Sequence, residues 1–137
     1  MVDVPPALLD RVRAICLGLP ETYEEPAWVG VRWRVRQRTF AHLFTVDDDS
    51  TTSLKDAFEP GRETTAVTFR VPGDELQALR QMGDPFFYVG WGRDVMAVRL
   101  DEASDWDEVR ELLTDSYCVL APHKLVARVD VPPGRDG

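Results

Sequence analysis

The chain has 137 residues, with 24 acidic against 16 basic side chains and a formal net charge of -8 at pH 7. A chain of this length buries one hydrophobic core rather than two, and a composition of 44% hydrophobic and 29% charged residues excludes collagen-like, disordered and membrane-spanning classes. Residues 1–10 contain no basic residue and no sustained apolar stretch, unlike a signal peptide. We therefore expect one cytoplasmic domain over residues 1–131 with no membrane partner, followed by a disordered tail over 132–137.

The first predicted element is a helix over residues 5–17. Prolines stand in its first turn, where a backbone N–H has no helical partner, and Gly18 is a stop signal. Its apolar residues follow the spacing of one buried stripe: Leu8, Val12, Ile15 and Leu19. This helix is therefore expected to pack one face against the core.

Residues 28–46 alternate between apolar and polar side chains, which predicts two strands. With Gln37 and Arg38 as the turn, the strands would form a hairpin whose large apolar groups share one face. The pairs expected to face each other are Val35 with Phe40, Trp33 with His42, Val31 with Phe44 and Val29 with Val46. The other face would carry arginines.

The rest of the pattern predicts a long acidic loop over residues 47–63 and then a mixture of strands and helices. Residues 125–131 fit a strand or a helix. The expected elements are strands over 65–71, 86–89 and 95–100 and helices over 74–82 and 104–121. This mixed order favours an α+β fold, with an antiparallel sheet packed on one face by helices.

Four segments of the chain together resemble the sequence pattern of a known family. They are WRVRQRTFAHLF at 33–44, TFRVPGDELQALR at 68–80, DPFF at 84–87 with Gly90-Trp91, and DWDEVRELLTDSYCVLAPHKL at 105–125. Together they resemble the MmcQ/YjbR-like family, and the pair Ser116-Tyr117 is the most specific part. The resemblance implies a CyaY-like fold of the frataxin type, a label of DNA binding, and no agreed catalytic residues. Arg70 departs from the family pattern, in which a lysine often follows the strand.

The chain contains no motif of the common catalytic or cofactor-binding classes. G-x-S-x-G, H-E-x-x-H and the glycine-rich phosphate-binding patterns are all missing from the sequence. His42, His123, Cys16 and Cys118 lack the spacing of zinc ligands. We therefore expect a protein that is not an enzyme, with no catalytic residue, metal or cofactor, and in which His42 is a packed imidazole.

The clearest candidate binding site is the run Arg32, Arg34, Arg36 and Arg38. Residues 28–40 carry these four positive charges and no negative one, and side chains on one face of a strand repeat about every 7 Å, which suits successive phosphates of DNA. The alternative is a solvated face whose arginines pair with acids elsewhere. The seven acids of residues 101–115 would neutralise the arginines if the last helix packed across the hairpin.

Two further binding functions stay open. Trp28, Tyr88 and Trp91 are aromatic residues near turns, and with Lys124 they would form a pocket for a small molecule or a protein partner. The less favoured alternative is frataxin-like metal binding by acids that cluster near a helix start: Asp101, Glu102, Asp105, Asp107 and Glu108. Acids in a first helical turn also simply favour the helix dipole.

Overall fold

The computed structural model describes residues 4–27, 29–46, 64–83, 85–89 and 94–129. The strands are β1 (Tyr23–Pro26), β2 (Val31–Val35), β3 (Arg38–Val46), β4 (Thr64–Arg70), β5 (Phe86–Tyr88) and β6 (Val95–Leu100). The helices are α1 (Pro6–Leu17), α2 (Gly73–Met82), α3 (Trp106–Leu120) and α4 (His123–Val126). The predicted acidic loop over 47–63 and the predicted tail over 132–137 lie outside the described residues.

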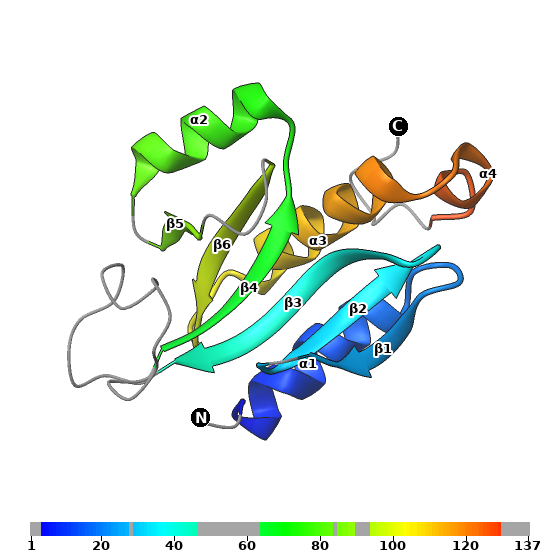
Figure 1. The fold of residues 1–137 in the computed structure, drawn as a ribbon. Coiled ribbons are helices and arrows are strands. Elements are labelled where there is room, and N and C mark those ends of the chain that lie inside the picture. Colours follow the sequence, from blue (N-terminus) through cyan, green and yellow to red (C-terminus); the bar gives the residue numbers. More distant parts are fainter. Residues whose placement is uncertain (1–3, 28, 47–63, 84, 90–93, 130–137) are drawn as a thin grey trace.

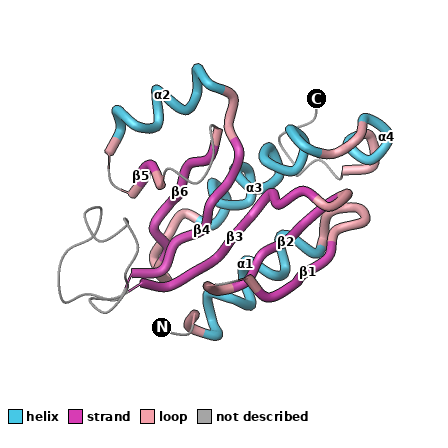
Figure 2. Tube along the Cα trace, in the orientation of Figure 1, coloured by secondary structure: helices cyan, strands magenta, loops and turns pink. Residues whose placement is uncertain are grey.

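The strands form one antiparallel six-stranded sheet in the order β1-β2-β3-β4-β6-β5. Helices α1 and α3 lie across the same face of the sheet (Figure 1), which we call the helix face, and the opposite side is the second face. Helix α2 packs against β5 and β6. Figure 2 shows the helices and strands in the same orientation, coloured by secondary structure. The predicted α+β class is therefore confirmed. No helix in the described part of the chain is long and apolar enough to cross a membrane.

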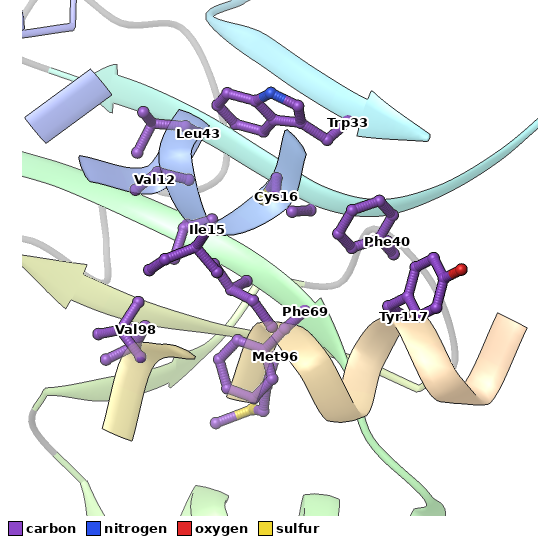
Figure 3. Close-up of a cluster of buried hydrophobic side chains, with 14 of the residues drawn as sticks. Val12, Ile15, Cys16, Trp33, Phe40, Leu43, Phe69, Met96, Val98 and Tyr117 are labelled. Carbon is purple, nitrogen blue, oxygen red and sulfur yellow. The ribbon is translucent and has the colours of Figure 1, made fainter. Parts of the chain in front are cut away.

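The main hydrophobic core lies between the helix face and the helices. The four residues of the predicted α1 stripe are all buried: Leu8, Val12, Ile15 and Leu19. Trp33 from β2, Phe69 from β4 and Tyr117 from α3 are fully or almost fully buried in the same cluster (Figure 3). The Tyr117 ring meets the Phe40 ring edge-on, with 5.6 Å between centroids. Burial of these large apolar groups is the main favourable contribution to folding.

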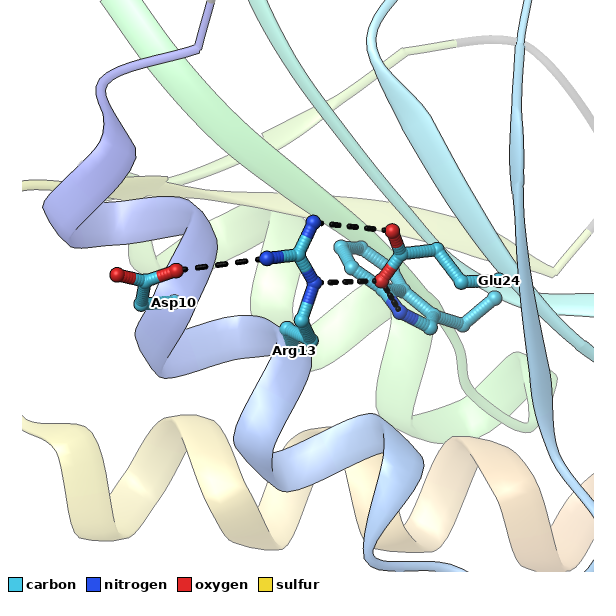
Figure 4. Close-up of polar contacts among 4 residues, drawn as sticks. Asp10, Arg13 and Glu24 are labelled. Atoms are coloured by element: carbon cyan, nitrogen blue, oxygen red, sulfur yellow. Dashed lines mark hydrogen bonds and ion pairs between the residues drawn. The ribbon is translucent and has the colours of Figure 1, made fainter.

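A charged clamp on the helix face ties α1 to the first two strands. Glu24 of β1 accepts hydrogen bonds from Arg13 Nε (2.8 Å) and Arg13 Nη2 (3.0 Å), and from the indole Nε1 of Trp33 (3.0 Å) (Figure 4). The hydrogen bond from Arg13 is the main reason that the pKa of Glu24 lies below its usual value. The clamp gives the buried Trp33 N–H the acceptor that it needs.

The second face carries a smaller buried cluster, so both sides of β3 are covered along part of its length. Phe44 of β3 and Ala66 of β4 are 0% exposed within this cluster, whereas their neighbours Leu43 and Val67 are 0% exposed in the main core. A strand buried on both sides gives little apolar–polar alternation from which to infer its orientation.

The predicted register of the β2–β3 hairpin is wrong. The two residues between the strands are Arg36 and Gln37, both with positive φ (50° and 67°), as in the two-residue turns that match strand twist. The pairs nearest the turn are Arg34 with Thr39 and Val35 with Arg38, and beyond the bulge the pairs are Trp33 with Ala41, Arg32 with His42 and Val31 with Leu43. Phe40 is the extra residue of a β-bulge. The bulge shifts the pairing and leaves His42 and Phe44 on the face of Arg32, which no alternation pattern predicts.

Strand β1 has no counterpart among the predicted elements. It runs antiparallel to β2, with Glu25 opposite Arg32 and Glu24 opposite Trp33. The turn between β1 and β2 requires Gly30, because its φ is +74° and a Cβ there would lie 1.9 Å from the Leu43 carbonyl oxygen. This close approach brings the β1–β2 turn against β3.

The helix ends differ slightly from the prediction. Asp105 rather than Ser104 caps α3, since its carboxylate accepts from the Glu108 N–H. Pro72 is the N-cap of α2, and Asp74 lies in the first turn. The first two residues of the segment 125–131, which fitted a strand or a helix, belong to the short helix α4, and Leu125 is buried in the main core.

Candidate anion site on the second face

The four predicted arginines fall into two groups. Arg32 and Arg34 lie on β2 and both contact Glu25, which places them on the second face. Arg36 stands in the turn, and Arg38 is the exposed first residue of β3. Arg32 and Arg34 therefore lie together on the second face, whereas Arg36 and Arg38 lie at the hairpin turn.

Acidic residues at and beside β1, rather than those of the last helix, partner the arginines. Glu25 forms ion pairs with Arg32 and, at 3.1 Å, with Arg34 Nη1. Helix α3 lies on the helix face, so its acids do not cross the second face. Burial alone would raise the pKa of Glu25, but the hydrogen bonds and the positive charges of Arg32 and Arg34 together outweigh this effect and lower the pKa. The expected pairing of the arginine face with acids elsewhere is thus seen for Arg32 and Arg34.

A hollow of about 370 Å³ opens on the second face over β2, β3, β4 and β6. Its polar lining comes from two arginines, a histidine and two threonines: Arg32, Arg70, His42, Thr39 and Thr68. Ala27, Phe40, Phe69 and Val95 complete the lining, and Ala27 and Val95 have apolar side chains. Cationic and hydroxyl donors therefore meet in one concave site with apolar walls.

The hollow lies where β3 and β4 stop pairing. Their last pair at this end is Ala41 with Phe69, and the bulge at Phe40 follows directly. Ser116 of α3, 0% exposed, bridges the two strands there. Its hydroxyl donates to the Phe40 carbonyl (2.6 Å) and accepts from the Arg70 N–H (2.7 Å). The bridge satisfies two backbone groups that the sheet leaves without strand partners.

Tyr117, the next residue of α3, contacts the same region. Its hydroxyl donates to the Pro20 carbonyl at 2.8 Å, and its ring packs on Phe40. The most specific pair of the family signature, Ser116-Tyr117, is therefore structural: one residue ties α3 to the bulge and the other ties α3 to the chain after α1.

His42 is a buried polar residue of the hollow, with 8% of its surface exposed. Its Nε2 contacts the Val29 carbonyl; a carbonyl only accepts, so Nε2 carries the hydrogen. Burial is the main cause that lowers the pKa of His42, with a smaller contribution from Arg32, while the Val29 contact opposes the shift. The imidazole is therefore neutral near pH 7, and the positive charge of the hollow resides on the arginines.

Two arginine atoms on the second face lack a hydrogen-bond partner. Among the described residues, Arg32 Nε and Arg34 Nε are both buried and have no acceptor within hydrogen-bonding geometry. A buried donor without an acceptor is uncommon in folded proteins and costs stability. The second face thus has more guanidinium donors than Glu25 satisfies.

Only two of the four residues of the predicted aromatic pocket lie in the described part of the chain. Trp28 and Trp91 lie outside it. Tyr88 is in β5, where the Arg80 guanidinium stacks 4.4 Å from its ring centre, and Lys124 is in α4, at the far side of the molecule from β5 (Figure 1). The structure does not bring Tyr88 and Lys124 together.

Two of the acids near the start of α3 accept hydrogen bonds from nearby backbone groups. The Asp105 carboxylate accepts from Glu108 N, and the Asp101 carboxylate accepts from Ala103 N. Within the described ranges, no group of three or more histidine, cysteine, aspartate or glutamate side chains has the geometry to hold a metal ion. The metal-binding alternative therefore gains no support.

Sequence reasoning did not identify Thr39, Thr68 and Arg70 as site residues. Thr68 stands opposite both His42 and Ala97 in the sheet, but these partners are far apart in the chain. Arg70 could have been noticed from the sequence, because it stands where the family pattern often has a lysine. The pairing of β4 with β3 brings Arg70 to the same hollow as Arg32.

These features define an α+β fold whose sheet has one helix-covered face and a polar hollow on the other. The YjbR family model matches residues 17–119, and the chain belongs to the YjbR family. A Deinococcus radiodurans protein with the family domain DUF419 is similar in structure, with a TM-score of 0.62, 16% identity and 94% of both chains covered. A Pseudomonas syringae protein, a Northeast Structural Genomics Consortium target, gives a TM-score of 0.64 at 12% identity over 86% of this chain and 100% of that one. No curated protein matches in sequence. These structural likenesses establish the fold alone.

Proposed function

We propose that the domain binds a small organic anion, with a carboxylate or phosphate group, in the hollow of the second face. The observation that carries this proposal is the convergence of Arg32 and Arg70, from β2 and β4, on one cavity. Guanidinium groups offer planar donor pairs that match carboxylate and phosphate oxygens. The hydroxyls of Thr39 and Thr68 add short, neutral donors to the same cavity.

The size and lining of the hollow favour an organic anion over an inorganic ion. Its volume of about 370 Å³ lies near the lower end of the range of about 300–1,000 Å³ typical of small-molecule sites. Ala27 and Val95 provide apolar wall, which a ring or short alkyl group would cover. We further propose, as the sequence predicts, that the domain is a binding module rather than an enzyme and acts in the cytoplasm.

The test is a titration with two probes of matched shape, benzoate and phenyl phosphate, followed by amide chemical shifts. Saturable shifts are expected at β3 and β4 around His42 and Thr68, and they should disappear in Arg70→Gln. Arg11→Gln is the matched control, because Arg11 lies on α1 at 4.9 Å from the Trp106 ring, on the other side of the sheet. The absence of saturable binding of both probes would overturn the proposal.

A second candidate function is binding of DNA at the tip of the β2–β3 hairpin. Glu21 contacts Arg36 and Arg128, each at 3.3 Å, and so brings the hairpin turn beside the end of α4. The exposed Arg38 is the first residue of β3 after the same turn. Clustered basic side chains at one end suit phosphates, and the family resemblance carries a DNA-binding label. The net charge of -8 opposes this function.

A gel-shift assay with duplex DNA at low salt separates the two functions. DNA binding would weaken steeply with salt and in an Arg36→Ala, Arg38→Ala double variant, while benzoate binding in the hollow would persist in that variant. A lack of any shift at low salt would exclude the DNA function without affecting the first proposal.

A further inference from the structure

Glu25 stands beside the hollow and holds one of its two arginines. Glu25 and Arg32 are directly opposite in the β1–β2 pairing, and one oxygen, Glu25 Oε1, contacts both Arg32 Nη2 and Arg34 Nη1. All three side chains are partly exposed, at 31%, 37% and 23% respectively. The carboxylate of Glu25 thus makes the contact with Arg32 that a bound anion would make.

We propose that Glu25 competes with the bound anion for Arg32 and thereby sets the affinity and the charge selectivity of the hollow. This inference rests on the proposed function. Glu25 is an internal carboxylate that occupies guanidinium donors facing the site, and a ligand anion gains those donors by displacing it. An exposed ion pair is weak, so displacement is feasible for a ligand that also covers the apolar wall.

The competition depends on the charge of the ligand. Repulsion between Glu25 and a ligand grows in proportion to the ligand charge, so a dianion is penalised more than a monoanion. Benzoate carries one negative charge, and phenyl phosphate carries nearly two at pH 8. Glu25 therefore favours carboxylates over phosphate monoesters in the unmodified protein.

The experiment compares the affinity of both probes for the natural protein and for Glu25→Gln by calorimetric titration at pH 8. Glutamine keeps the shape and removes the charge. The expected result is about threefold tighter benzoate binding and a larger gain for phenyl phosphate, as for removal of one surface ion pair. Glu25→Asp, which keeps the charge on a shorter side chain, should give a smaller gain and provides a second variant if Glu25→Gln is poorly folded.

Asp10→Asn is the matched control. It removes the same charge from α1, where Asp10 contacts Arg13 at 3.4 Å on the helix face, and it should leave both affinities unchanged. If the natural protein binds the probes but Glu25→Gln binds them no more tightly, or if Asp10→Asn gives the same gain, the role of Glu25 is refuted and the site stands. If neither protein binds either probe, the proposed function fails and this inference fails with it.

Discussion

On the helix face of the sheet, Glu24 receives three hydrogen bonds from Arg13 and Trp33 beside a packed core. On the second face, the adjacent Glu25 shares one oxygen between Arg32 and Arg34 beside a hollow. Both sites use carboxylate and guanidinium groups, yet only the first also satisfies a buried indole N–H. The comparison teaches that an ion pair stabilises the fold where it completes a buried hydrogen-bond network. Where guanidinium donors outnumber their acceptors, the remaining donors are available to a ligand.

The largest expected effect comes from Glu24→Ala. The substitution leaves the Nε1 of fully buried Trp33 without its acceptor, and loss of a partner for a buried donor costs about 2–3 kcal/mol. Chemical denaturation should show this loss in the free energy of unfolding. Glu25→Ala should have a much smaller effect, because its ion pairs are partly exposed. Equal losses in both variants would contradict the distinction between the faces.

Ser116→Ala tests the bridge that links the helix face to the hollow. It removes the partner of the Phe40 carbonyl and of the Arg70 N–H, so we expect a loss of about 2 kcal/mol in the free energy of unfolding. Ser104→Ala is the control, because the Ser104 hydroxyl also accepts a backbone N–H, that of Asp101, but in an exposed position. A similar small loss in both variants would show that the bridge contributes little.

Acid should weaken the clamp on the helix face. The hydrogen bond from Arg13 keeps the folded pKa of Glu24 below the ordinary value of 4.5, so the unfolded chain binds the proton more readily. The contribution of Glu24 to stability is fully present above about pH 4.5 and is lost as the pH falls through the folded pKa. The free energy of unfolding should therefore fall more steeply below this pH in the natural protein than in Glu24→Gln. Parallel curves would contradict the prediction.

The smallest effect on stability, and the only expected increase in stability, is at the hairpin turn. Gln37 has φ of 67°, a left-handed conformation that costs a residue with a Cβ about 1 kcal/mol. Gln37→Gly should raise the free energy of unfolding by up to about 1 kcal/mol, and the carbonyl that accepts from Arg34 is retained. A destabilised variant would show that the Gln37 side chain matters more than its backbone geometry.

Several elements are predicted correctly from their local sequence pattern. Helix α1 follows from its apolar stripe, and β4 follows from the alternation that includes Val67 and Phe69, although β4 and β6 are buried on both sides. Strand β1, Tyr-Glu-Glu-Pro, has no such pattern, because pairing with β2 rather than apolar burial makes it a strand. The hairpin register failed for a related reason, since the Phe40 bulge is not visible in the pattern.

The candidate site was predicted in part. Arg32 was identified from its charge, but Arg70 and Thr68 become neighbours of Arg32 only through the pairing of β3 with β4. The sequence also left open whether the acids of the last helix would neutralise the arginines, and the structure shows that Glu25 of β1 pairs with Arg32 and Arg34 instead. Pairing between strands decides both which residues line the hollow and which acid partners the arginines, and a local sequence pattern does not reveal that pairing.

The composition of β1 also bears on self-association. As the edge strand of the described sheet, β1 presents backbone groups to which another chain could add a strand. It is only four residues long, ends at Pro26 and carries Glu24 and Glu25 on alternate sides. Short length, proline and like charges all disfavour edge-to-edge pairing. The glutamates that hold Arg13 and Arg32 therefore also protect the sheet from aggregation through this edge.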